Sequence, residues 1–188
     1  MKRLNLFPAA AALAIIAVPL ISLAAGPGQP YAGQQGRAIK ALSADDVAGL
    51  LAGKGMGFAK AAELNHYPGP RHLLDLAGDL GLAPQKVARI EAVFKAMNRE
   101  AARLGKEIVG KEGELDALFA SARAEAAKVE ELTAAIGVLW GRLRAVHLKA
   151  HIVTRPLLGA GQVARYDALR GYGPGGGDHS GHGKHKGH

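Results

Sequence analysis

An apolar repeat with alternating steps of three and four residues runs from residue 87 to residue 153 and constrains the fold more than any other feature. Residues spaced in this way lie on one face of an α-helix, as in the seam between packed helices. Only Lys111 interrupts the spacing up to Ala122, and the repeat resumes at Val129, so the sequence predicts two long helices. The members of the repeat are Val87, Ile90, Phe94, Met97, Ala101, Leu104, Ile108, Leu115, Leu118, Ala122, Val129, Leu132, Ile136, Leu139, Leu143, Val146, Ala150 and Val153.

The repeat keeps its phase across residues 115–136, so the spacing alone also permits one continuous helix. Such a rod would measure roughly 100 Å at about 1.5 Å per residue, and it could bury its apolar stripe only against another chain. We expect the chain instead to fold back near Ser121–Glu125, where apolar residues become sparse. The predicted fold class is all-α, a long antiparallel helical hairpin with short bracing helices.

The bracing helices are expected where capping residues and prolines mark helix starts. We place them after Ser43, over roughly 70–80 and over 162–170. These helices complete a domain over residues 42–172. A Gly-, Pro- and Gln-rich segment precedes it, so residues 25–41 are interpreted as a flexible leader.

The N-terminus has the pattern of a secretory signal. Lys2 and Arg3 precede an almost wholly apolar run over 6–20, and Ser22-Leu23-Ala24 has the small–x–small form of a cleavage site. The sequence therefore predicts a signal peptide over 1–24 and a periplasmic protein. The alternative is an uncleaved helix that anchors the protein to the inner membrane, because the apolar run approaches the roughly 20 residues that span a bilayer.

The composition excludes several classes of chemistry. The chain of 188 residues has no cysteine, which rules out disulfides, thiolate metal sites and a cysteine nucleophile. It also has no serine elbow motif, no glycine-rich phosphate loop after a strand and no pair of acids set apart from the helix surfaces. We therefore expect no enzymatic activity and no organic cofactor, and any metal must be held by His, carboxylate or Met.

The formal net charge of +8 falls to +6 if Lys2 and Arg3 leave with the signal. Clustered basic residues often bind nucleic acid, but export makes that partner unavailable. The charge is spread along the two predicted long helices. It is consistent instead with acidic proteins, unfolded chains or anionic lipid as partners.

Histidines offer the metal ligands. His147 and His151 are four residues apart on one predicted helix, so both imidazoles project from one face and can share an ion. In the frame of the repeat, His147 flanks the seam and His151 lies further outward. Further ligands could come from His66, His72 or Asp75. The alternative is that these histidines are polar edge residues or cap the carbonyls of other elements.

A second group of histidines lies in the C-terminal tail, residues 173–188, which is Gly-rich and predicted to be disordered. A flexible chain with four imidazoles can wrap nickel, copper or zinc, although ordering it costs entropy. The alternative is a solvated tail with incidental metal affinity. The four residues recur at every third position: His179, His182, His185 and His188.

A short internal repeat links the two ends of the long-helix region. Leu82-Ala-Pro-Gln-Lys86 and Leu158-Gly-Ala-Gly-Gln162 are offset by 76 residues, and each is followed by Val-Ala-Arg. We expect each copy to open a helix and to brace opposite ends of the hairpin. The motif residues that we single out are Leu82, Leu158 and Gln162.

On these motifs the sequence resembles, over roughly 65–172, the LTxxQ family of periplasmic proteins, which includes Spy/CpxP-like chaperones, the zinc-resistance-associated protein and CnrX-like heavy-metal sensors. The second copy keeps the Leu and Gln of the motif and has Gly in place of Thr. His147-Leu-Lys-Ala-His151 resembles the metal-site helix of the sensor branch. The resemblance implies an intertwined dimer of helical hairpins.

Two functions follow as expectations. The first is a periplasmic protein of the envelope stress or metal-resistance response that binds or senses a divalent transition metal (Ni, Cu, Zn or Co). The alternative is an ATP-independent chaperone that holds unfolded periplasmic proteins. The expected partners are a second copy of the chain and either unfolded proteins or a membrane-bound signalling protein, with no nucleic acid.

Overall fold

The computed structural model describes residues 29–172, and all regular secondary structure in this range is helical, which confirms the all-α prediction. One unit of the chain ends at Gly33, and only a turn at 29–33 is described of it; a second unit begins at Gln34. The predicted signal segment and the His-rich tail lie outside the described residues. Between residues 29 and 172, no helix is both long and apolar enough to cross a bilayer.

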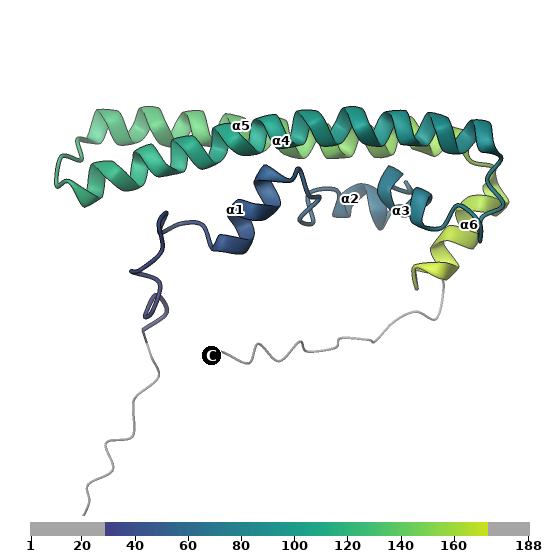
Figure 1. Ribbon diagram of the computed structural model, residues 1–188, viewed down its shortest axis with the longest axis horizontal. Helices are drawn as coiled ribbons and strands as arrows, with labels where there is room; N and C mark the ends of the chain where they lie inside the picture. The colour runs from purple at the N-terminus through teal and green to yellow at the C-terminus, as the bar shows by residue number, and fades with distance from the viewer. Residues whose placement is uncertain (1–28, 173–188) are drawn as a thin grey trace, which may run out of the picture. The chain divides into compact units, whose positions relative to one another are not determined.

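Two long helices form the framework of the second unit (Figure 1). α4 spans Pro84–Ala120 and α5 spans Ala126–Thr154, and a 3-10 turn, η1, continues α5 over Arg155–Leu157. The two helices pack side by side and are joined by residues 121–125. The chain therefore breaks where the sequence predicts and does not form a single rod.

Four short helices pack beside this pair: α1 (Ala44–Leu51), α2 (Lys60–Glu63), α3 (Pro70–Asp75) and α6 (Ala160–Leu169). α1 begins as predicted, because Ser43 Oγ accepts a hydrogen bond from the Asp46 N–H at 3.0 Å and the Asp46 carboxylate accepts from the Ser43 N–H. α3 is shorter than the predicted helix over 70–80, since a series of turns follows it. The sequence pattern did not predict α2.

The last residues of the expected leader contact α4. Ile39 packs against the apolar cluster around α1, and the Lys40 N–H donates to the Asp116 carboxylate at 3.0 Å. Lys40 Nζ lies 3.5 Å from the other oxygen of that carboxylate. Residues 39 and 40 are thus held against the long helices.

The core consists of two clusters along the helix pair. The first joins α1 to the middle of α4 and α5 through Leu42, Leu50, Ala101, Leu104, Ile108, Leu139 and Leu143. The second joins α3 and α6 to the start of α4 through Leu73, Leu80, Ile90, Leu158, Val163 and Tyr166. Between the two clusters, the loop before α3 packs on α5, and this is where the predicted histidine pair lies.

The buried face of α5 differs from the predicted seam at its C-terminal end. Leu139, Leu143 and Ala150 are buried as expected, but His147 and His151 are buried beside them, whereas Val153 is 51% exposed. A straight helix has about 3.6 residues per turn, so a stripe with a period of about 3.5 drifts around it. The interpretation of His151 as an outward residue is therefore wrong.

The two copies of the internal repeat meet at one end of the helix pair, not at opposite ends. Because α5 returns beside α4, the start of α4 lies next to the start of α6 (Figure 1). Gln162 Oε1 accepts from Lys86 Nζ at 3.1 Å, and Gln162 Nε2 donates to the Leu80 carbonyl at 3.1 Å. Leu158 is buried in the second cluster and Leu82 packs against it. The motif residues thus join α4 to α6.

α1 approaches α4 so closely at Gly105 that a side chain would not fit. A Cβ built there would lie 2.1 Å from the Leu50 carbonyl oxygen, which is backbone and cannot move aside alone. We predict that Gly105→Ala lowers the free energy of unfolding by about 1–3 kcal/mol, because overpacking outweighs the higher helix propensity of alanine. Denaturant unfolding followed by circular dichroism measures the change.

Gly110→Ala is the matched control, since Gly110 lies in the same helix and, apart from the neighbouring backbone of that helix, no atom lies within 4 Å of the added Cβ. At Gly110 only the higher helix propensity of alanine should act, and it should raise the free energy of unfolding by up to about 1 kcal/mol. Equal effects of the two substitutions would contradict the close approach of α1 to α4.

Candidate functional site

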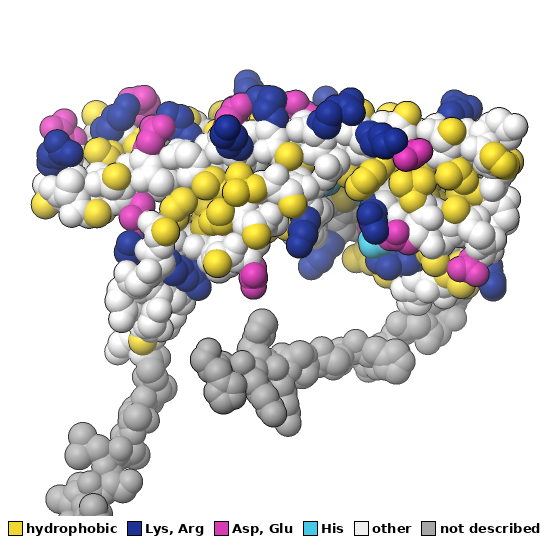
Figure 2. Space-filling model, in the orientation of Figure 1, with side chains coloured by type: hydrophobic (Ala, Val, Ile, Leu, Met, Phe, Trp, Pro, Cys, Tyr) yellow, Lys and Arg dark blue, Asp and Glu magenta, His cyan; other side chains and the backbone are white. Residues whose placement is uncertain are grey.

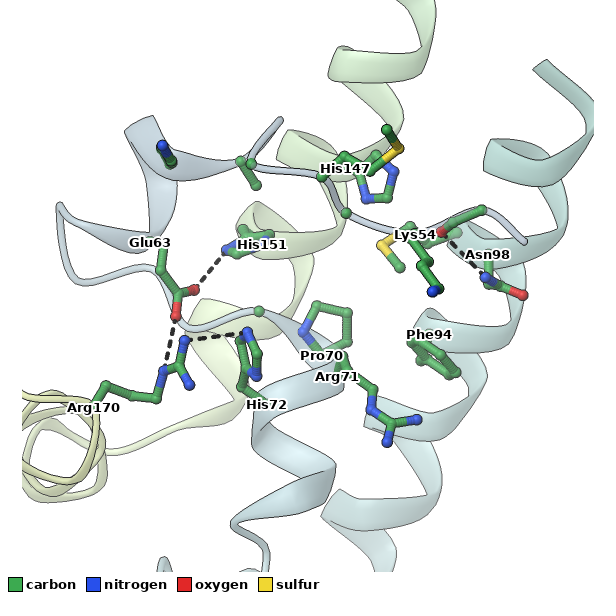
Figure 3. Close-up of a pocket in the computed structure, with 18 of the residues that line it drawn as sticks. Lys54, Glu63, Pro70, Arg71, His72, Phe94, Asn98, His147, His151 and Arg170 are labelled. Carbon is green, nitrogen blue, oxygen red and sulfur yellow. Dashed lines mark hydrogen bonds and ion pairs between the residues drawn. The ribbon is translucent and has the colours of Figure 1, made fainter. Parts of the chain in front are cut away.

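A pocket of about 720 Å³ lies between the two core clusters, lined by residues from α2, α3, α4 and α5 and from the end of α6 onward (Figure 3). Three of the predicted metal ligands line it: His72, His147 and His151. The loop over residues 52–57 forms a further wall. The pocket is large enough for a small organic ligand.

Asn98 of α4 holds this loop in place. Its side-chain amide donates to the carbonyls of Ala52 at 2.8 Å and Gly53 at 3.2 Å. Gly53 has a φ of +63°, and a side chain there would meet the Asn98 carbonyl oxygen at 2.6 Å, so the position favours glycine on both counts. The next residue, Lys54, consequently lines the pocket.

Two buried polar side chains of α5 hold the loop before α3. The His151 Nδ1–H donates to the Tyr67 carbonyl at 2.6 Å, and Thr154 Oγ1 donates to the Pro68 carbonyl at 2.6 Å. Gly69 makes this contact possible, because a Cβ there would lie 2.6 Å from the His151 ring. Since Nδ1 of His151 must carry the proton, its Nε2 has a free lone pair in the neutral ring.

Glu63 lies at the centre of a polar network at one end of the pocket. Its Oε1 accepts a hydrogen bond from the Tyr166 hydroxyl and lies 3.5 Å from Arg170 Nε. Its Oε2 lies 3.6 Å from His151 Nδ1 and has no hydrogen bond within the described structure. Burial, followed by the bond to Glu63, raises the pKa of Tyr166, so the phenol stays protonated and keeps donating.

His147 differs from the other histidines because its Nε2 is buried without a hydrogen-bond partner in the described residues. The residue is 3% exposed, and its ring stacks on Phe58 with centroids 5.6 Å apart. Burial, and secondly the charge of His151, lowers the pKa of His147. The ring is therefore neutral at pH 7, which is the form that binds metals.

The other predicted ligands have partners of their own. His72 Nε2 lies 3.3 Å from an Arg170 guanidinium nitrogen, and burial lowers the pKa of His72. Asp75 pairs with Arg71 at 3.1 Å. His66 Nδ1 lies 2.7 Å from the Asp167 carboxylate and does not line the pocket. The tail histidines lie outside the described residues.

The candidate ligands at this pocket are therefore fewer than the predicted set. His147 and His151 line it, and in the described residues Nε2 of His147 is buried with no hydrogen-bond partner; Met56 and Met97 also line the pocket. Between residues 29 and 172 no three His, Asp or Glu side chains are grouped so that they could hold one metal ion. The imidazole pair is the part of the predicted site that the fold brings to one place.

Sequence reasoning missed Glu63, Arg170 and Lys54. Glu63 lies in a four-residue helix with no apolar period, Lys54 lies in the loop before that helix, and Arg170 is separated from both by a long stretch of chain. No local spacing connects these residues. Only the return of α5 and the packing of α6 bring Arg170 to the carboxylate.

The lowered pKa of His147 makes stability depend on pH. Because the unfolded histidine takes up its proton near the ordinary pKa of 6.5, whereas the buried ring resists it, stability is lost as pH falls below that value. We predict that His147→Phe, which retains an aromatic ring against Phe58, weakens this loss. Denaturant unfolding of both proteins at pH 7.5 and about 5.5 measures the difference, and identical losses would contradict it.

Comparisons with protein-family models, with curated proteins and with solved structures find no match for this chain.

Proposed function

We propose that the protein binds a divalent transition metal in this pocket, with Nε2 of His147 and Nε2 of His151 as protein ligands. The observation that carries the proposal is the buried and unpartnered His147 Nε2. A buried polar atom without a partner costs about 1–3 kcal/mol, so its presence in a well-packed helix points to a role other than stability. A metal ion would satisfy this lone pair.

The surroundings of His151 suit the same role. Histidines that bind metals usually donate the other ring N–H to a carbonyl or carboxylate, which fixes the ring and leaves one nitrogen for the ion. His151 does so through the Tyr67 carbonyl at 2.6 Å, with Glu63 at 3.6 Å. The two rings are one helical turn apart and both line the pocket.

Imidazole donors suit nickel, copper, zinc and cobalt, and the lining thioethers would favour copper among them. We propose a role in sensing or buffering such an ion in the periplasm, consistent with the signal-like N-terminus, and without catalysis. The tail histidines would add weaker and flexible chelation. A membrane-bound signalling partner belongs to this proposal.

Isothermal titration calorimetry tests the folded site. Metal binding by the tail is first removed by replacing its four histidines with alanine in the full-length chain: His179, His182, His185 and His188. In this background, His147→Ala with His151→Ala should weaken Ni²⁺ or Cu²⁺ binding about tenfold or more, equal to about 1.4 kcal/mol. His66→Ala is the control, because His66 pairs with Asp167 outside the pocket. Equal affinities of parent and double variant would remove the site.

A second candidate function, holding unfolded proteins, is favoured by exposed apolar residues on the long helices. Phe119, Val138 and Ile152 are each more than half exposed. Figure 2 shows apolar side chains and Lys/Arg side chains interspersed over the same face. Such a surface attracts clients by charge and contacts them weakly. The same residues could be covered in an intertwined homodimer, which we propose as the assembly.

The chaperone proposal predicts that the protein suppresses aggregation of an unrelated unfolded client at near-stoichiometric ratio, and that added salt weakens the effect because screening removes the attraction. Light scattering at low and high salt measures it, and sedimentation of the protein alone measures the dimer. Phe119→Ser with Val138→Ser should reduce the suppression. Absence of suppression at low salt contradicts this function.

A further inference from the structure

The charges around the pocket are unlike those of a site for a bare cation. Four basic side chains line it, Lys54, Lys60, Arg71 and Arg170, against a single carboxylate, Glu63. Arg170 lies 3.5 Å from Glu63, and Arg71 pairs with Asp75. These two guanidinium groups are thereby largely neutralised.

Lys54 and Lys60 are not neutralised in this way. Within residues 29–172, neither ammonium group has a carboxylate at salt-bridge distance. Lys60 folds over Gly57, whose added Cβ would lie 3.3 Å from Lys60 Cε. In Figure 3, Lys54 points from its loop toward Pro70 and Phe94. The pocket therefore carries uncompensated positive charge that repels a free dication and attracts an anion.

The volume of the pocket also exceeds what an ion needs. Six water molecules, at about 30 Å³ each, would fill about a quarter of its 720 Å³. The rest is bounded partly by apolar surface from Phe94, Met97 and Pro70. Two imidazoles fill only two positions on an ion that takes four to six ligands, so the remaining donors can come from an organic molecule in the same space.

We propose that the pocket takes its metal as a complex with a small anionic chelator of the polycarboxylate class. The His147 and His151 nitrogens complete the coordination of the ion, while Lys54 and Lys60 bind carboxylates of the chelator. This inference rests on the metal-binding function proposed above and names the form in which the ion is recognised. It also explains how basic side chains and metal ligands can share one pocket.

Calorimetry with three titrants tests the inference on the full chain with the tail histidines replaced. The titrants are Ni²⁺ alone, citrate alone and the 1:1 Ni²⁺–citrate complex, which carries net negative charge. We expect the complex to bind about tenfold or more tighter than either component. The advantage should shrink as salt is added, because charge attraction produces it.

Substitutions of Lys54 and Lys60 test whether these two residues cause the tighter binding of the Ni²⁺–citrate complex. Lys54→Ala with Lys60→Ala should abolish the tighter binding of the complex and strengthen binding of Ni²⁺ alone, because the charge that repels the free ion is removed. Lys54→Arg with Lys60→Arg should retain most of the tighter binding of the complex. Lys106→Ala with Lys149→Ala removes the same charge from the long helices outside the pocket and serves as the control. An unchanged advantage in the Lys54/Lys60 alanine variant overturns the assignment.

The outcomes separate this inference from the function on which it rests. If Ni²⁺ alone binds as tightly as the complex and depends on His147, the chelate inference falls and the metal site stands. If citrate alone binds as tightly as the complex, the pocket is an anion site and the chelate inference falls. If neither Ni²⁺ nor the complex binds, both proposals fall.

Discussion

The buried face of α5 is the constraint on which the rest of the structure depends. Beyond Leu139 and Leu143 this face includes His147 and His151 together with Ala150. The two imidazoles lie beside the heptad seam at Val146 and Ala150 and are buried with it, because a helix with about 3.6 residues per turn does not follow a period of about 3.5. The loop at Tyr67–Gly69 then packs on His151 and Thr154, and the pocket forms beside this contact.

The histidines differ in their hydrogen bonds. His151 donates from Nδ1 to a loop carbonyl, so it stabilises the fold, and its Nε2 is a ligand in the proposed metal site. His66 and His72 have partners, Asp167 and Arg170, that account for them structurally. His147 alone of these four histidines has a buried nitrogen without a partner in the described structure. The proposed function therefore rests on one atom and its surroundings rather than on a motif.

Glu63 shows how the polar network and the pocket depend on each other. Its carboxylate accepts a hydrogen bond from the Tyr166 hydroxyl and lies close to Arg170 and His151. Side chains from α5, from α6 and from just after α6 therefore all interact with this one carboxylate of α2. Burial makes such a network costly unless its members are paired, and in the described residues Glu63 Oε2 and Arg170 Nε have no hydrogen-bond partner. Glu63 and Arg170 line the same pocket as His147 and His151, and Lys54, which is exposed, lines it too. The proposals of an ion and of an organic anion in this pocket depend on these two sets of residues.

The sequence by itself determined the helical class, the two long helices, the break at 121–125 and the cap at Ser43, because these depend on periodicity and on residues close in the chain. It also placed His147 and His151 together. Only the tertiary structure decided that His151 is buried, that both copies of the repeat lie at one end, and that Glu63, Arg170 and Lys54 join the histidines. The physical reason is that most of these contacts join residues far apart in sequence. Which residues meet depends on the rotation of the helix face and on the path of the short loops, and neither can be predicted from the spacing of neighbouring residues.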